Sequence, residues 1–377
     1  MTTISDLSRD LLVEIFSRVP LTSLSAVRST CKTWKALSKG QILGQKSAKK
    51  QFMAFMMIEH HYSIYSLRFE LQGIRNENYC YDEDLGKHIS MPTHQVEISQ
   101  IFHCDGLLLC VPLDQSRLFV CNPYLEQSRL VQTKNKFHRK SDMYVLGYDN
   151  NNNHKILSFS IVDSNIKDIE LYCFSSDTWR VLDVCPVYCN LNSKFFVSLK
   201  GNTYFCSPDH ASEEKNGLFC FDFTTERFGP LLPLPPPFHS GYYKVTDIIS
   251  SNEKLVLLHN AYVCEKVEIW ITTKIEPNVV LWNKFWTLDW YFIKGLFPDD
   301  YWLYFDCRSW FIDEEKKVVV FFDITPKTCF FQMAYIIGED GYFRSVNLGA
   351  APYPEWVYHN IEYYNYVPSL VQLQLQV

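Results

Sequence analysis

A unit of strand, polar turn and strand recurs along the chain at intervals close to 50 residues. The clearest copies lie at 172–179 and 219–228, with a shorter one at 120–123. Equivalent positions are 53, 47 and 49 residues apart, counting from Cys121 to Phe174, Phe221 and Trp270. Repeats of this length are typical of β-propeller blades, in which each sheet buries its faces against its neighbours. The repeat therefore predicts a propeller, and its irregularity leaves a two-sheet sandwich as the alternative.

Short apolar runs support this prediction from about residue 52 onward. Aromatic residues make up 16% of the chain, and flat rings favour the pleated surface of strands. Turn residues such as Asp105-Gly106 and Gly201-Asn202 separate the runs. The predicted strands are 107–111, 118–121, 144–147, 156–162, 170–174, 195–199, 218–223, 254–258, 267–272, 317–322 and 334–337.

The last seven residues alternate strictly between apolar side chains and glutamine. Val371, Leu373, Leu375 and Val377 occupy the apolar positions, the pattern of a half-buried strand. Such a strand could pair with the first blade and close the ring, which would remove two free sheet edges. An ordinary edge strand is the alternative.

The first forty residues follow a helical period instead. Apolar residues recur at helical spacing between Leu11 and Val19, Ser8 can cap the start of this helix, and Pro20 ends it. Two further short helices are predicted before Gly40, which suits a helix C-terminus. Three helices of this size bury little apolar surface. The module therefore either docks on the rest of the chain or offers an apolar face to another protein.

Charge separates this module from the remainder of the chain. The first 50 residues hold 9 Lys or Arg and 3 Asp or Glu, a balance of +6, and the remainder has 27 minus 39, or −12. Such an asymmetry suggests two modules with different partners, although a chance run of solvated lysines would look the same. The acidic remainder argues against nucleic-acid binding, because phosphate would repel it.

Segments 7–20, 23–24 and 31–37 of the N-terminal module hold hydrophobic, proline, cysteine, lysine and tryptophan residues in a distinctive order and spacing. In this pattern the module resembles the F-box motif, except that Ser8 stands where the motif usually has proline. The resemblance implies docking on a Skp-type linker protein and, through it, on cullin and RING subunits. Residues that would face the linker, or support that face, are Leu7, Leu11, Ile15, Pro20, Leu24, Val27, Cys31 and Trp34. Several of these could instead form the module's own core.

The rest of the chain holds a second ordered set of short motifs, at 102–110, 122–123, 146–149, 175–180 and 366–371. Through these motifs it resembles the plant F-box-associated interaction domain. The resemblance implies a β-rich domain that selects a target protein. The expected division is an F-box module at 1–45, a hinge with the first strands at 46–94, and the target-binding domain at 95–377.

The densest aromatic stretch, 282–305, is a candidate for the target-binding surface, because tryptophan and tyrosine often dominate binding energy. The candidate target-binding residues within this stretch are Trp290, Tyr291, Tyr301 and Trp302. Rings that fill blade cores are the alternative.

The sequence contains none of the common motifs for catalysis, cofactor binding or metal binding. The sequence has no nucleophile elbow, zinc-protease helix, P-loop or dinucleotide-binding glycine pattern. The pairs His60-His61, Cys185 with Cys189, and Asp299-Asp300 are more economically explained as loop or core residues. We therefore expect no catalytic, cofactor-binding or metal-binding residues.

Cysteine usage points to a reducing compartment. The 13 cysteines are scattered without a zinc-type pair, and no signal-peptide pattern or membrane-length apolar run occurs. Cytoplasm or nucleus is the expected location, with no membrane partner.

These observations together predict an α+β multidomain chain, with a small three-helix F-box module followed by an all-β, kelch-like propeller. The two resemblances imply the function of a non-catalytic substrate-recognition adaptor of an SCF-type ubiquitin ligase. Two alternatives stay open. One is a scaffold or lectin-like propeller whose helical module only packs within the chain. The other is a propeller hydrolase, for which convergent carboxylates would be needed.

Overall fold

A computed structural model of the chain describes residues 8, 10–12, 15, 30, 34, 52–58, 63–69, 87–88, 98–114, 117–123, 125, 127–133, 142–162, 165–184, 195–207, 217–236, 243–261, 266–289, 310–325, 331–339, 341–350, 361–366, 369 and 371–373. Its strands are β1 (Phe52–Ile58), β2 (Ser63–Phe69), β3 (Lys87–His88), β4 (Ile98–Cys104), β5 (Leu107–Pro112), β6 (Arg117–Asn122), β7 (Gln127–Gln132), β8 (Asp142–Tyr148), β9 (His154–Val162), β10 (Asn165–Cys173), β11 (Thr178–Val181), β12 (Phe196–Leu199), β13 (Asn202–Ser207), β14 (Gly217–Asp222), β15 (Arg227–Phe228), β16 (Tyr243–Ser251), β17 (Lys254–Ala261), β18 (Lys266–Glu276), β19 (Val279–Asp289), β20 (Trp310–Asp313), β21 (Val318–Thr325), β22 (Phe331–Gly338), β23 (Phe343–Ala350) and β24 (Ile361–Tyr366).

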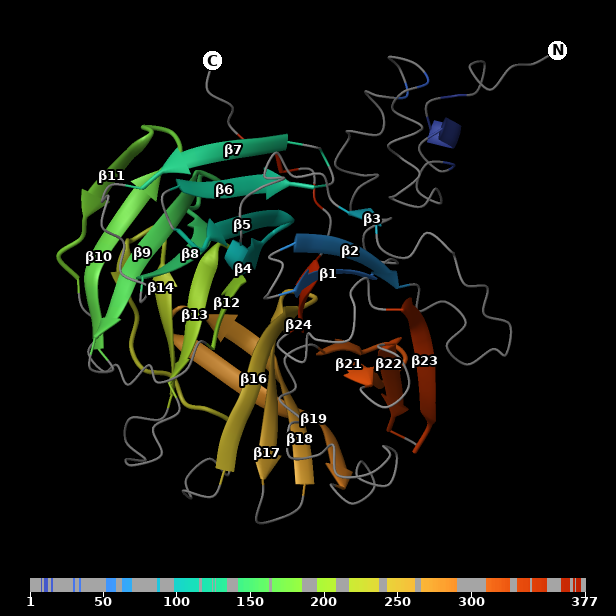
Figure 1. Ribbon diagram of the computed structural model, residues 1–377. Coiled ribbons are helices and arrows are strands. Elements are labelled where there is room, and N and C mark those ends of the chain that lie inside the picture. Colours follow the sequence, from blue (N-terminus) through green and yellow to red (C-terminus); the bar gives the residue numbers. More distant parts are fainter. Residues whose placement is uncertain are drawn as a thin grey trace.

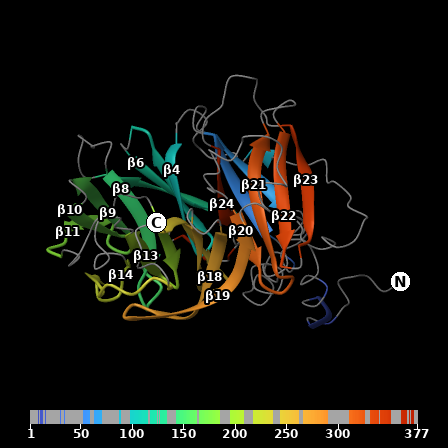
Figure 2. The same ribbon diagram turned by 90° about the horizontal axis from the view of Figure 1, so that it is seen from below.

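The described strands form six four-stranded antiparallel sheets. Five sheets take four consecutive strands each, from β4–β7 to β20–β23, and the sixth has the order β24-β1-β2-β3. One end strand of each sheet contacts the corresponding strand of the next sheet. In order around the ring these strands are β4, β8, β12, β16, β20 and β24, and β24 contacts β4 again. Figure 1 shows the sheets as blades of one propeller, and Figure 2 shows the same ring from below. The propeller predicted from the sequence is confirmed.

The repeat positions found in the sequence fall at equivalent places in the fold. Cys121, Phe221 and Trp270 lie in β6, β14 and β18, the third strands of their sheets, and Phe174 directly follows the third strand β10. The interval near 50 residues is therefore the length of one blade with its connection. All eleven predicted strands overlap observed strands: 107–111, 118–121, 195–199 and 218–223 agree to within a residue at both ends, and the other seven differ by two to five residues at one end.

The ring closes through β24, so the predicted closure by the last seven residues is wrong. β24 pairs with β1 from Met53↔Tyr366 to Ile58↔Ile361, which joins the two ends of the propeller in one sheet. Residues 371–373 are in no strand. The alternation instead reflects burial: Leu373 is buried and Gln372 is exposed.

Side chains of the β4–β7 blade hold this C-terminal segment. The amide of Asn122, a fully buried side chain, donates to the carbonyl oxygens of Ser369 at 3.1 Å and Val371 at 2.7 Å. The backbone N–H of Leu373 donates to Gln127 Oε1 at 3.0 Å. These bonds satisfy backbone groups that a strand partner would otherwise have to pair.

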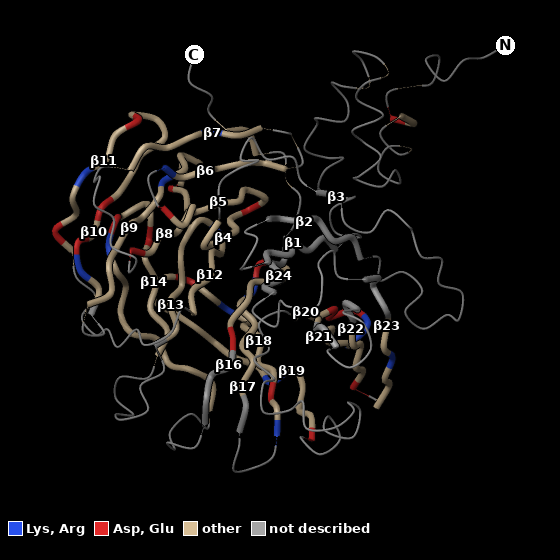
Figure 3. The backbone as a smooth tube through the Cα atoms, viewed as in Figure 1, with Lys and Arg blue, Asp and Glu red and all other residues tan. Residues whose placement is uncertain are grey.

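Three apolar clusters build the described core, and each spans more than one blade. The largest joins β4–β7, β8–β11 and β12–β15 and includes Leu373. A second lies between β12–β15 and β16–β19, and a third between β16–β19 and β20–β23. Strands β5, β12 and β13 contain no charged residue, as the uninterrupted tan tubes of Figure 3 show. Apolar packing between neighbouring blades therefore contributes to the stability of each blade.

One face of the propeller carries short turns, which we call the turn face. It consists of the hairpin turns 105–106, 149–153, 174–177, 200–201, 223–226, 252–253, 277–278 and 314–317. Eight of the nine described non-glycine residues with positive φ lie in these turns, and the ninth, Asp168, lies at a bulge in β10. Ser369 of the C-terminal segment contacts Asp105 on the turn face. Inter-blade contacts then follow this face around the ring: Asp105–Tyr148, Tyr148–Gly201, Lys200–Glu253 and Lys254–Glu314.

The predicted three-helix module lies mostly outside the described residues. Helical conformation is described at 10–12 and at Ile15, Thr30 and Trp34. Ser8 caps the first helix as predicted, because its Oγ accepts the backbone N–H of Leu11 at 3.3 Å. Within the described part of the chain, no helix has the length and apolarity needed to cross a bilayer.

Candidate functional site

The first helix presents two apolar side chains to solvent. Leu11 is 54% exposed and Ile15 is 38% exposed, whereas Leu12 is 5% exposed. Positions four apart lie on one face of a helix, so Leu11 and Ile15 form a pair on the outer side. Exposed large apolar residues of this kind are candidates for contact with another protein.

The other predicted linker-facing residues are only partly described. Trp34 is half-buried. Leu7, Pro20, Leu24, Val27 and Cys31 lie outside the described residues, so their placement stays a prediction.

The predicted target-binding residues also lie outside the described residues. Trp290, Tyr291, Tyr301 and Trp302 fall in the sequence between the end of β19 and the start of β20. At the beginning of the same aromatic stretch, Trp286 is buried in an inter-blade cluster and Trp282 packs against another. For these two rings, the alternative that aromatics fill blade cores is confirmed.

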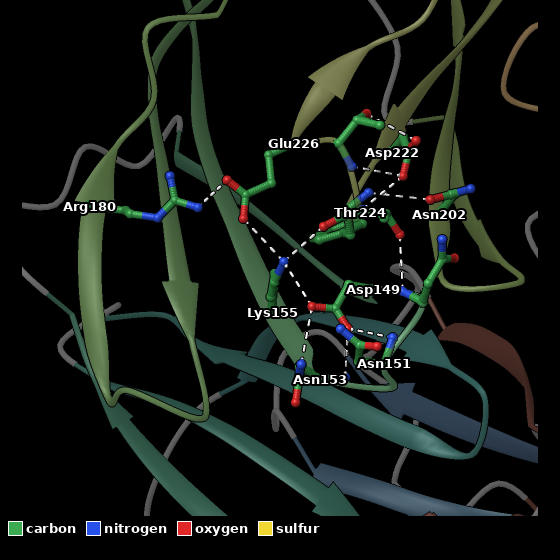
Figure 4. Close-up of polar contacts among 12 residues, drawn as sticks. Asp149, Asn151, Asn153, Lys155, Arg180, Asn202, Asp222, Thr224 and Glu226 are labelled. Atoms are coloured by element: carbon green, nitrogen blue, oxygen red, sulfur yellow. Dashed lines mark hydrogen bonds and ion pairs between the residues drawn. The ribbon is translucent and has the colours of Figure 1, made fainter.

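The best-defined polar site is a network between the β8–β11 and β12–β15 blades (Figure 4). Its centre is the ammonium of Lys155 on β9, whose side chain is 10% exposed. Lys155 Nζ lies 2.9 Å from the carbonyl oxygen of Phe223, 3.1 Å from Glu226 Oε1 and 3.2 Å from Asp149 Oδ2. Two carboxylates and a carbonyl thus surround one buried cation.

The turn after β8 shapes one side of this network. Asp149 Oδ1 accepts the backbone N–H groups of Asn151 at 2.9 Å and Asn153 at 3.0 Å. Burial opposes ionisation of Asp149, but these hydrogen bonds and Lys155 outweigh it and hold the pKa of the carboxyl below its usual value. The spacing Asp-x-Asn-x-Asn resembles part of a calcium loop, yet here the cation is the chain's own lysine.

Glu226 closes the network from the neighbouring blade. Glu226 contacts both Lys155 and Arg180. Burial opposes ionisation of its carboxyl, but the two cations outweigh burial and lower the pKa of that carboxyl. The backbone N–H of Asn150 also donates to Thr224 Oγ1 at 3.0 Å, another bond across the same interface. Both carboxylates pair with cations, so the arrangement joins two blades.

A similar contact joins the β4–β7 and β8–β11 blades. Arg129 is 8% exposed, lies 2.9 Å from Asp177 Oδ1, donates to the carbonyl oxygen of Phe174 and sits 5.0 Å from the centre of that ring. Tryptophan N–H groups make further bridges: Trp179 Nε1 donates to Gln132 O at 2.7 Å and Trp310 Nε1 to Asp247 Oδ2 at 2.9 Å. Sequence analysis identified none of these contacts, because each joins residues of different blades.

Buried titratable groups elsewhere have the properties of core residues. Burial raises the pKa of the Cys206 thiol to about 12, so it stays protonated and unreactive. Among the residues that the structure describes, no group of three His, Cys, Asp or Glu side chains could hold a metal ion.

His259 on β17 is fully buried, 3.9 Å from Glu268 Oε2. Burial lowers the pKa of its imidazole to about 4, because the protonated ring would lose its hydration; Glu268 opposes this shift and Lys284 adds to it. The neutral ring is therefore the form that the fold accepts.

Acid should destabilise the protein through this histidine. In the unfolded chain the ring takes up a proton below pH ~6.5, whereas in the folded chain it does so only near pH 4, so stability is lost as pH falls across that interval. We expect the His259→Gln variant to lose about 3 kcal/mol less than wild type between pH 7 and pH 4. Urea unfolding at both pH values measures this difference, and equal losses in the two proteins would contradict the assignment.

The geometry defines a class of protein: a β-propeller preceded by a helical segment with an exposed apolar pair. The F-box domain family matches residues 4–46, and the F-box associated beta propeller domain family matches residues 53–373. The chain therefore belongs to the F-box proteins that carry an F-box-associated propeller.

Relatives from Arabidopsis thaliana match nearly the whole chain. F-box protein At3g49510 is 52% identical over 99% of this chain and 100% of its own length. F-box/kelch-repeat protein At3g13680 is 45% identical over 100% of this chain and 98% of its own length. Among solved structures, apo AztD from Citrobacter koseri covers 84% of this chain and 98% of that chain at 8% identity and a TM-score of 0.43, too distant to bear on function.

Proposed function

We propose that this protein is a substrate-recognition adaptor of an SCF-type cullin–RING ubiquitin ligase. Residues 4–46 dock on a Skp-type linker and, through it, on cullin and RING subunits, while the propeller holds a target protein. The observation that carries the proposal is the exposed pair Leu11 and Ile15 on a capped helix inside the F-box match.

Charge supports this assignment of partners. Linkers of the Skp type are acidic, and the first 50 residues of the chain have a balance of +6. Opposite charge speeds encounter and orients the two surfaces. Ser8 stands where proline is usual, and its capping bond to Leu11 fulfils the same structural need at the start of the helix.

The proposed mechanism needs no catalytic group in this chain. Holding the target near the ligase raises the effective concentration of the reacting groups, and the other subunits supply the chemistry. We propose that this takes place in the cytoplasm or nucleus, without a cofactor, nucleic acid or membrane.

Linker binding is the first test. We expect the full-length protein to bind a plant Skp-type linker with submicromolar affinity, and the triple variant Leu11→Ala, Ile15→Ala, Trp34→Ala to bind at least about 100-fold more weakly, because apolar anchors dominate such interfaces. Calorimetry or surface plasmon resonance measures both values.

The matched control is Leu130→Ala, which removes a leucine that is 46% exposed on the propeller strand β7. This variant should bind the linker like wild type. Absence of binding by folded wild type would reject the adaptor function and favour a scaffold whose helical module packs only within the chain. Because Trp34 is half-buried, the single variant Ile15→Glu gives the same test with less risk to folding.

A further inference from the structure

The longest outermost strand among those described is β19. The outermost strands β3, β7, β11, β15 and β23 have 2, 6, 4, 2 and 8 residues, whereas β19 has 11 and pairs with the 11-residue β18. Every outermost strand turns a row of backbone N–H and C=O groups away from its sheet. Strand β19 therefore offers the longest described row of such groups.

One face of the β18–β19 hairpin is buried against the preceding blade. Ile275 and Val280 are 8% and 6% exposed, and Trp282 Nε1 donates to the carbonyl oxygen of Pro233 at 2.9 Å. A Cβ on Gly229 would lie 2.7 Å from the carbonyl oxygen of Pro277, so the hairpin tip rests directly on that residue. Figure 2 shows β19 extending below the neighbouring blade in that view. These contacts fix the hairpin in place.

The opposite face of the same hairpin is open. Val279 is 37% exposed and Leu281 is 55% exposed. Their partners across the hairpin are Glu276 and Lys274, which pair with each other at 3.4 Å. Two apolar side chains at alternate positions thus lie beside an ion pair that is already satisfied.

The two halves of β19 differ in how their edge is protected. In the second half, Phe285 forms a bulge, and Lys284 lies 4.9 Å from the centre of the Trp270 ring and 2.6 Å from Glu268 Oε1. Bulges and lysines are the usual devices that keep edge strands from pairing with other chains. Residues 279–283 contain no charge, no proline and no bulged residue, because the nearby bulge falls at Thr273 on β18.

We propose that residues 279–283 of β19 bind an extended, uncharged segment of the target protein, which joins the β16–β19 sheet as a fifth strand. Backbone hydrogen bonds would supply affinity, and side chains beside Val279 and Leu281 would supply selectivity. The charge pattern decides the occupant: residues 279–283 are neutral and the adjacent ion pair is closed, so a charged segment would lose hydration without gaining a partner. This inference rests on the proposed function, because it assigns a surface to the target.

The test measures amide hydrogen exchange of the full-length protein with a synthetic probe. The probe is a nine-residue peptide of alternating valine and threonine with two lysines beyond each end, at millimolar concentration. We expect at least tenfold slower exchange at those backbone amides of residues 279–283 that point away from β18, since the alternate amides already bond that strand. A matched peptide with proline at alternate positions should have no effect, because proline cannot donate to the ladder.

Two variants make the test specific. Leu281→Lys places a charge within residues 279–283 and should abolish the protection from exchange. Leu130→Lys places the same charge on β7, at a leucine that is 46% exposed, and should leave the protection unchanged. Protection that is absent in wild type, or equal in both variants, would overturn the proposal. Concentration-dependent dimers that Leu281→Lys abolishes would also overturn it, since the occupant would then be a second copy of the chain.

The outcome can be separated from failure of the adaptor function. Leu281→Lys should bind the Skp-type linker like wild type, and the triple F-box variant should still bind the probe. Loss of linker binding in wild type with intact probe binding would reject the ligase function and leave the strand-addition site standing as a property of the propeller.

Discussion

Replacement of Lys155 by methionine is expected to lower the free energy of unfolding by about 3–5 kcal/mol. Methionine nearly matches the length of the lysine side chain, so packing changes little while the charge disappears. Asp149 and Glu226 would then lose the cation that they share, and the carbonyl oxygen of Phe223 would lose its hydrogen-bond donor. Leaving a buried hydrogen-bond acceptor without a donor costs more free energy than an exposed ion pair contributes to stability.

The matched control is Lys317→Met. Lys317 is 65% exposed and lies 2.8 Å from Glu339, whose side chain is 50% exposed. Water screens such a pair, so the expected loss is below about 1 kcal/mol. Urea unfolding of wild type and both variants provides the comparison, and equal losses would show that the buried network contributes no more than a surface ion pair.

The stability that this network contributes should also depend on pH. The pKa values of the Asp149 and Glu226 carboxyls are lowered in the folded protein, so the stability they contribute is present at neutral pH and is lost as pH falls through the folded-state values. In Lys155→Met the pKa values of both carboxyls should be lowered less than in wild type. Acid unfolding of this variant should therefore begin from a free energy of unfolding that is already reduced at neutral pH.

Local patterns in the sequence were sufficient to predict the blades. Apolar runs such as 107–111 and 156–162 coincide with β5 and β9 because burial within a blade follows the alternation and turn chemistry of the local chain. The cap at Ser8 was predictable for the same reason, since Ser8 and Leu11 are three residues apart. Repeat spacing then identified the propeller.

Contacts between blades were not predictable from one sequence. Lys155 and Glu226 are 71 positions apart, and nothing in the sequence around either residue specifies the other. Ring closure was assigned to the alternating C-terminal residues, whereas β24, with the less regular sequence Ile-Glu-Tyr-Tyr-Asn-Tyr, joins β1. Alternation reports which side chains are buried, and it does not report which backbone provides the hydrogen bonds.

The distance between blades also depends on a residue that has no side chain. Gly147 lies in β8, where a Cβ would be 2.3 Å from the ring of Phe223 and 2.4 Å from the carbonyl oxygen of Gly201 on the next blade. That same carbonyl accepts the backbone N–H of Tyr148 at 2.9 Å. An added methyl group would therefore push apart two backbones that are hydrogen-bonded to each other.

We expect Gly147→Ala to lower the free energy of unfolding by about 3 kcal/mol, at the upper end of the cost of overpacking, because one of the two groups that the added methyl would meet is a backbone carbonyl. Gly341→Ala is the matched control: Gly341 has a φ of +78° and nothing within 4 Å of the position of a Cβ, so its expected cost is about 1 kcal/mol from the backbone alone. Urea unfolding of the two variants separates crowding from conformation. A larger loss in Gly341→Ala would mean that turn conformation, and not the close approach of the blades at Gly147, limits the stability of the propeller.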